Sequence, residues 1–246
     1  MSFGEIFSSV FYEPLYNALV LVVSVVPGGD IGIAVILLTL LVRGALLPFA
    51  HKSVKTQQTL RRIDPEIKRL RERHNGNQEE QARAMMNLYK EHGINPLSGC
   101  ASALIQFPVI IALYWVFWKG LAGGNLIVEN LYSFVSPPHV NFIFLGILDM
   151  RERSILFAIF AALSQFIQIK LSFPPTPPRE VSQGSTSFGD ELKRSMGFQM
   201  RYVLPGVIFF VSIGFPAAVP LYWCTSNLFS IGHELLVKRR AKELLV

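Results

Sequence analysis

Long apolar runs constrain this chain more than any other feature of its sequence. A membrane core about 30 Å thick is crossed by roughly 20 helical residues. The chain is 51% hydrophobic and 16% charged, and its mean hydropathy is +0.39. It is therefore expected to be an all-α polytopic membrane protein with five transmembrane helices. The apolar runs are Ile31 to Ala50, Ala101 to Trp118, Ser154 to Phe173, Tyr202 to Val219 and Ala217 to Val237.

Two shorter segments refine this expectation. The last two runs overlap, so residues Gly214 to Pro220 must hold a very tight turn. A sixth run, Leu15 to Val26, has only 12 residues before Pro27. That length predicts an interfacial amphipathic helix rather than a span.

The distribution of basic residues predicts the orientation in the membrane. Residues 1–42 hold no Lys or Arg, residues 51–74 hold eight, and the tail after residue 237 holds four. Because basic residues mark the cytoplasmic side of short loops, we expect the N-terminus outside and the C-terminus inside. We also expect no cleavable signal peptide and no lipid anchor, since no basic residue precedes Arg43 and no cysteine lies near the start.

Between the first two spans the sequence predicts a cytoplasmic helical hairpin. Leu60, Ile63, Ile67 and Leu70 are spaced as a heptad seam, and Ala82, Met85 and Tyr89 repeat that spacing after a turn at residues 74–77. The expected organisation is an outer N-terminus with the interfacial helix (1–29), spans at 30–50, 96–118, 154–173, 201–216 and 217–237, the hairpin (51–95), an outer loop (119–153), a cytoplasmic linker (174–200) and a basic tail (238–246).

No catalytic or metal-binding motif stands out. The five histidines are scattered, and Cys100 and Cys224 lack metal-ligand spacing. We therefore expect no enzyme activity, no cofactor and no metal.

Arg43 is the residue that most needs an explanation, because an arginine at mid-helix costs a few kcal/mol in a membrane. Thr39 shares its helix face. Two interpretations stay open. Arg43 could line a wet cavity with other polar residues of the spans, or it could pair with the carboxylate of Glu234. The polar residues are Thr39, Gln106, Ser164, Gln165, Gln168, Thr225, Ser226 and Asn227.

Several motifs together resemble those of one family. They are "LTLLVRGALLPF", "PEIKRLRER", "MMNLYKEHGINPLSGC", "LIQFPVIIALYW" and "PLYWCTSNLFSI". In this order they are similar to the YidC/Oxa1/Alb3 membrane protein insertases, over nearly the whole chain from Glu13 onward.

The resemblance implies five helices around a positively charged hydrophilic groove that draws in acidic or polar client segments. The family's groove residues fall on Arg43, Thr39 and Gln106, and its client-contacting aromatics fall on Tyr222 and Trp223. To these the polar residues of the spans add Gln165 and Asn227 as candidates. The implied partners are nascent membrane-protein clients and the lipid bilayer of the bacterial cytoplasmic membrane, with the ribosome and Sec translocon reached through the hairpin and the basic tail.

The sequence departs from the family pattern in a few places. His233 and Glu234 stand where many members carry glutamines. We also expect neither the large extracytoplasmic domain and extra first span of Gram-negative members, nor the lipoprotein cysteine or long basic tail of others.

Two other functions remain open. One is a small-anion channel or carrier with Arg43 as its binding charge, which the missing inverted repeat disfavours. The other is an assembly chaperone that holds helices without inserting them.

Overall fold

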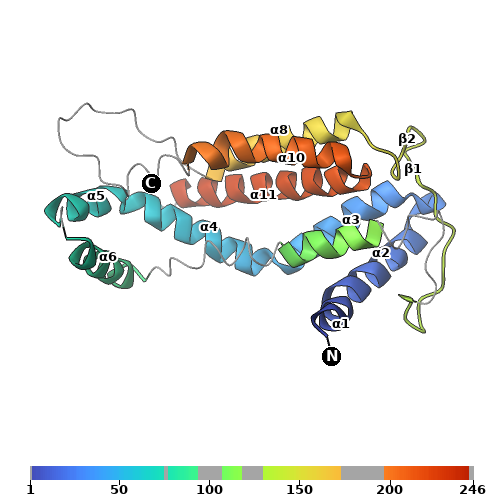
Figure 1. The fold of residues 1–246 in the computed structure, drawn as a ribbon, viewed down its shortest axis with the longest axis horizontal. Coiled ribbons are helices and arrows are strands. Elements are labelled where there is room, and N and C mark those ends of the chain that lie inside the picture. The colour runs from blue at the N-terminus through green and yellow to red at the C-terminus, as the bar shows by residue number, and fades with distance from the viewer. Residues whose placement is uncertain (1, 75–76, 94–106, 118–129, 173–196, 244–246) are drawn as a thin grey trace.

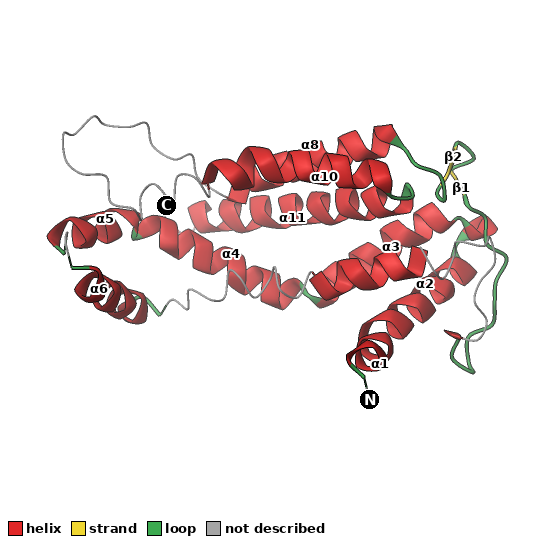
Figure 2. Cartoon of the chain, in the orientation of Figure 1, coloured by secondary structure: helices red, strands yellow, loops and turns green. Residues whose placement is uncertain are grey.

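The structure is a computed structural model that describes residues 2–74, 77–93, 107–117, 130–172 and 197–243, and these residues are mainly helical (Figures 1 and 2). The all-α fold class is thereby confirmed. The helices are α1 (Phe3–Phe7), η1 (Ser8–Tyr12), α2 (Glu13–Val25), η2 (Pro27–Gly29), α3 (Ile31–Ala45), α4 (Leu47–Arg62), α5 (Asp64–Arg73), α6 (Gln78–Glu91), residues 107–117, α8 (Ile155–Ser172), η5 (Gln199–Val203), α10 (Leu204–Gly214) and α11 (Ala218–Glu243).

The N-terminal helix is longer than its apolar run suggests. A capping box between Ser2 and Glu5 starts it, and α1, η1 and α2 follow one another without a break. Its segment Gly4–Val25 has 22 residues and is apolar enough to cross a membrane. The predicted length of 12 residues was therefore wrong. The interfacial position of this helix stays a prediction.

The helix predicted over 30–50 is in fact two helices. α3 ends at Ala45, α4 begins at Leu47, and the two are bent by 64°. Pro48 explains the bend, because it has no N–H to donate and its ring would clash with the carbonyl of Gly44 in a continuous helix.

The number of spans depends on how this bend is counted. Among the described residues, Gly4–Val25 and Ile155–Ser172 are each long and apolar enough to cross a membrane, and the bent pair α3–α4 would be a third span. Gln199–Gly214 is apolar but shorter. The predicted second span is described only over residues 107–117, so the count of five stays a prediction.

Three C-terminal helices, α8, α10 and α11, run alongside one another, with α8 packed against both α10 and α11 (Figure 1). The turn from α10 to α11 is as tight as the overlap of the two runs predicted, with three residues between Gly214 and Ala218. Backbone N–H groups of Ala217 and Ala218 donate to the carbonyls of Glu152 and Met150, at 2.8 and 3.2 Å. The loop before α8 thus fixes this turn.

The main core joins the N-terminal helices to the start of α11. Tyr16, Val35, Val116 and Ala217 are among its fully enclosed members, one each from α2, α3, the 107–117 helix and the turn before α11. Lipid tails are as apolar as these side chains, so in a membrane it is close van der Waals packing that holds α3 against α11.

A small cap covers the end of the bundle where α3 and α11 begin. Strands β1 (Ile143–Phe144) and β2 (Leu148–Asp149) pair antiparallel, with Phe144 opposite Leu148. Asp30 starts α3 by accepting hydrogen bonds from the N–H groups of Gly32 and Ile33. Hydrogen bonds from Arg151 hold the pKa of the Asp149 carboxyl below its ordinary value.

At the other end, α5 and α6 form a hairpin that extends away from the bundle (Figure 1). Ile63 and Ile67 are buried, and Leu60, Leu88 and Tyr89 pack against them. Leu60, Ile63, Ile67 and Tyr89 of the predicted seam thus form a separate small core together with Leu88. The prediction was wrong for Ala82, which is exposed. Its cytoplasmic location stays a prediction.

Candidate functional site

Arg43 lies in the last turn of α3, directly before the bend. This position is favourable for a cation, because the helix C-terminus carries partial negative charge. Its side chain is half-buried and reaches across to α11, where Nε donates to Oγ of Ser226 at 2.8 Å and Nη2 donates to the same oxygen. Ser226 itself is buried. The charge is therefore held by a hydroxyl group.

No carboxylate among the described residues lies within 4 Å of the Arg43 guanidinium. Glu234, the partner that the sequence suggested, binds other groups. Its Oε1 pairs with Lys238 Nζ at 2.8 Å, and its Oε2 accepts from Ser172 Oγ at 2.6 Å. Ser226 and Glu234 are eight residues apart on α11, about 12 Å along the axis. Arg43 therefore does not pair with Glu234: Arg43 bonds Ser226, and Glu234 pairs with Lys238.

Thr39 and Tyr222 lie on the same side of the bundle as Arg43. Both are buried, and Thr39 Oγ1 donates to the Val35 carbonyl of its own helix at 2.6 Å. They line one small pocket between α2, α3, the 107–117 helix and α11. The other lining residues are apolar: Leu15, Val35, Leu38, Val42, Val109 and Leu113.

Asn227 contributes to a different interface, between α8 and α11, and Gln165 bonds within α8. Asn227 Nδ2 donates to Ser164 Oγ at 3.1 Å, and Gln165 Nε2 donates to Gln168 Oε1 at 3.3 Å. Because Asn227 follows Ser226 on α11, its side chain points about 100° away around the helix. The predicted groove residues are therefore divided between two faces of α11.

Trp223 and Gln106 are the two remaining candidates for the site. Trp223 is half-buried and packs against the main core. Gln106 lies outside the described residues, as does most of the linker predicted over 174–200.

A polar chain links the far ends of α8 and α11. Gln168 Nε2 donates to Ser172 Oγ at 3.4 Å, and Ser172 in turn donates to Glu234. Lys238 Nζ donates to the Leu171 carbonyl at 2.7 Å as well as pairing with Glu234. Lys238 therefore neutralises the buried carboxylate of Glu234 and caps the C-terminal end of α8 by bonding the Leu171 carbonyl. The spacing of four residues between Glu234 and Lys238 is the sequence signal for this pair, since side chains four apart on a helix are neighbours.

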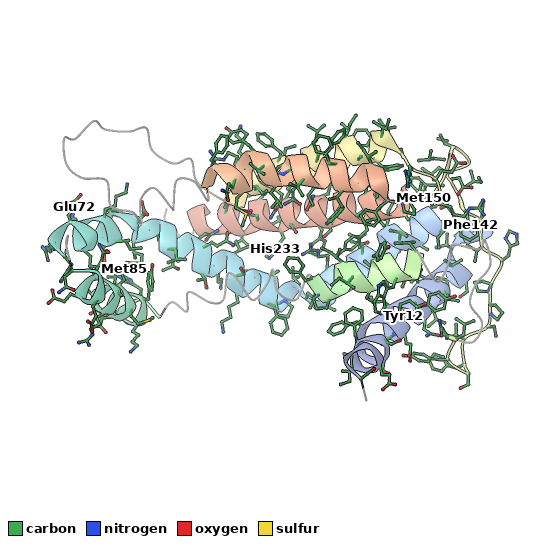
Figure 3. All side chains as sticks on the ribbon, viewed as in Figure 1. Tyr12, Glu72, Met85, Phe142, Met150 and His233 are labelled. Atoms are coloured by element: carbon green, nitrogen blue, oxygen red, sulfur yellow. The ribbon has the colours of Figure 1, made fainter. Side chains whose placement is uncertain are left out.

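A histidine pair joins α4 to α11 beyond the bend. His51 Nδ1 and His233 Nε2 are 3.4 Å apart, and His233 lies between α11 and α4 (Figure 3). In the part of the chain that the structure describes, no three His, Cys, Asp or Glu side chains gather as a metal site. The contact is a link between two helices near Arg43.

Comparison with known proteins identifies the family. Residues 22–243 match the model of the 60Kd inner membrane protein family. The chain is 32% identical over 212 residues to the membrane protein insertase YidC of Francisella tularensis subsp. novicida (strain U112), and equally to that of Francisella tularensis subsp. tularensis (strain SCHU S4 / Schu 4).

In each case the alignment covers 86% of this chain and 33% of the relative, so the chain spans about a third of the length of the curated relatives it matches. The matched region includes α3, α8, α10 and α11, and therefore Arg43 and Ser226. The chain belongs to the 60Kd inner membrane protein family, that is, the YidC/Oxa1 family of polytopic membrane proteins.

Proposed function

We propose that this chain is a membrane protein insertase and chaperone. The observation that carries the proposal is the half-buried guanidinium of Arg43, which has a hydroxyl partner on α11 and no carboxylate partner among the described residues. The relatives that share a third of their length with this chain are named membrane protein insertases, which supports the same function.

The charge would act on the first step of insertion. Moving a polar or acidic tail into the bilayer is costly, and a fixed positive charge part-way across reduces that cost. The client's apolar helix would then partition into lipid by the hydrophobic effect. A membrane potential that is negative inside adds about 2.3 kcal/mol per charge per 100 mV in favour of moving an acidic tail outward. No nucleotide and no catalytic group is needed.

The other groove candidates would complete a surface for the client segment. We assign this role to Thr39 and Tyr222, which lie near Arg43, and to Trp223 and Gln106. Gln165 and Asn227, the other predicted candidates, would instead support this surface from α8 and from its contact with α11. The proposed topology has five spans with the N-terminus outside and the C-terminus in the cytoplasm. In that topology the α5–α6 hairpin and the basic tail face the cytoplasm, where they would contact the ribosome and the Sec translocon.

Insertion into liposomes tests the proposal. The full chain would be reconstituted and supplied with two single-span clients that differ only in an acidic or a neutral tail, and insertion would be scored by protease protection. Arg43→Lys keeps the charge and should retain much of the activity. Arg43→Ala should lose insertion of the acidic client and spare the neutral one.

A matched control removes a basic charge elsewhere. Lys170→Ala changes an exposed residue near the end of α8 and should affect neither client. If Arg43→Ala impairs both clients equally, the groove-charge mechanism is wrong. A small-anion channel or carrier predicts a different result, in which liposomes with the wild-type chain conduct chloride and Arg43→Ala abolishes this flux.

A further inference from the structure

The β1–β2 hairpin presents apolar side chains at its tip instead of polar ones. Leu145 is 60% exposed and Ile147 is 84% exposed. Leu145 and Gly146 both have positive φ, 51° and 73°. Phe144 pairs with Leu148, so the turn between the strands has three residues, Leu145 to Ile147. Gly and Asn adopt positive φ readily, whereas a bulky residue there is strained. The tip thus exposes a large apolar residue at a position where Asn would fit better.

This strained tip is held firmly at its base. The Leu145 N–H donates to Oδ2 of Asp30 at 2.8 Å, while Oδ1 of Asp30 caps α3. The Phe144 ring packs so closely on Gly32 that a Cβ at Gly32 would lie 2.2 Å from it. A buried carboxylate therefore fixes both the start of α3 and the turn of the hairpin, with the tip side chains pointing outward.

The position of the hairpin brings it to the edge of a lipid-facing surface. It lies at the end of the bundle where α8 begins, near the labelled Phe142 and Met150 (Figure 3). The first turn of α8 exposes Ile155 and Leu156. The exposed charged residues Arg151, Glu152 and Arg153 lie between the strands and α8. Such a change from apolar to charged residues is typical of the boundary between acyl chains and headgroups.

The small size of the hairpin tip favours a lipid bilayer over another protein as its binding partner. A stable protein interface buries about 800 Å² and 20–30 residues on each side. The hairpin tip offers the side chains of Ile143, Leu145 and Ile147, which are too few for such an interface. A bilayer interface accepts a few apolar side chains when the rest of the protein already holds them at the right depth.

We propose that the tip of the β1–β2 hairpin inserts Leu145 and Ile147 into the interfacial region of the bilayer leaflet at the end where α3 and α8 begin. This contact anchors the first turn of α3 through Asp30. Arg43 lies 13 residues after Asp30, about 20 Å along the α3 axis. The anchor therefore sets the depth at which the arginine sits in the membrane, and it does not depend on the proposed insertase activity.

Depth measurement by spin labelling tests this inference. A nitroxide is attached at Ile147→Cys in a full chain that carries Cys100→Ser and Cys224→Ser, reconstituted alone in vesicles of phosphatidylethanolamine and phosphatidylglycerol. Collision rates with oxygen, which enriches in lipid, are compared with those of a water-soluble nickel chelate. The Ile147 label should favour oxygen. The matched label at Glu152→Cys, at the exposed base of the hairpin, should favour the chelate.

A second variant separates insertion from strain. Leu145→Asn relieves the positive-φ strain and removes one apolar side chain, so the thermal midpoint should stay the same or rise while the Ile147 label shifts toward the aqueous reagent. Equal chelate access at Ile147 and Glu152, or no shift with Leu145→Asn, would overturn the proposal. A lipid signal that disappears at high lipid-to-protein ratio would instead identify a second copy of the chain as the occupant, and would overturn it as well.

Discussion

The guanidinium of Arg43 in α3 donates hydrogen bonds to the buried hydroxyl of Ser226 in α11, with 2.8 Å between Nε and Oγ. These two residues are 183 positions apart in the sequence. A hydroxyl group orients the arginine but leaves its charge unneutralised, unlike a carboxylate. The contact therefore suits a residue that must attract an incoming anion.

Removing the Ser226 hydroxyl should weaken the α3–α11 contact. A hydrogen bond to a charged group contributes about 1.5–3 kcal/mol, so Ser226→Ala should lower the thermal midpoint in detergent and reduce insertion of an acidic client. Ser230→Ala is the matched control, because among the described residues the Ser230 hydroxyl bonds only the Ser226 carbonyl of its own helix. Equal midpoints for the two variants would show that the Arg43–Ser226 contact contributes little.

Asp30 should be the most sensitive polar residue of the cap. Asp30→Ala removes the α3 N-cap and the acceptor for the Leu145 N–H, and the two losses together should destabilise the protein by about 1–3 kcal/mol. Asp30→Asn can still cap α3 through Oδ1, but its amide cannot accept from Leu145. Hydrogen exchange should therefore quicken at Leu145 in both variants and at Gly32 only in Asp30→Ala. Protection of Leu145 in Asp30→Asn would contradict this account.

Much of the helical framework could be predicted because its signals are local. The apolar runs predicted helices, the overlap at Gly214 to Pro220 predicted the tight turn, and the spacing of Leu60, Ile63 and Ile67 predicted the α5–α6 seam. The bend after Ala45 was missed although Pro48 signals it, because a proline near the end of an apolar run is also compatible with an uninterrupted span.

The contacts of the site were harder to predict. Thr225, Ser226 and Asn227 are consecutive, so their side chains point in three directions around α11. Which of them meets Arg43 depends on how α3 and α8 pack against α11, and that packing is tertiary. The sequence therefore suggested a polar cluster but not its division into an Arg43–Ser226 contact and an Asn227–Ser164 contact.

The proposed topology can be checked with two exposed positions. In a chain with Cys100→Ser and Cys224→Ser, Glu79→Cys on α6 should react only with a reagent that enters the cytoplasmic side. Ser133→Cys in the loop before β1 should react only from outside. Labelling of both from one side would end the five-span arrangement, and it would do so independently of the insertion assay.

The buried carboxylate of Glu234 forms an ion pair with the half-buried Lys238 on α11. Glu234 pairs with Lys238 and accepts from Ser172, so Glu234→Gln should destabilise the protein by leaving Lys238 without its counter-charge. The loss should be about 1–3 kcal/mol. Breaking a fully buried ion pair costs about 3–5 kcal/mol. The loss here should be smaller, because 27% of the Lys238 side chain is exposed.

A pair of double-mutant cycles then separates this ion pair from Arg43. Glu234→Gln with Lys238→Met should show a coupling of about 1 kcal/mol or more, because the two side chains are in contact. Glu234→Gln with Arg43→Ala should be additive within about 0.5 kcal/mol, because the two have no shared partner among the contacts described above. Glu234→Gln should also fail to restore insertion of an acidic client to Arg43→Ala. Full restoration of stability and insertion by that double change would mean that Arg43 serves only to balance Glu234, and the groove-charge mechanism would have to be abandoned.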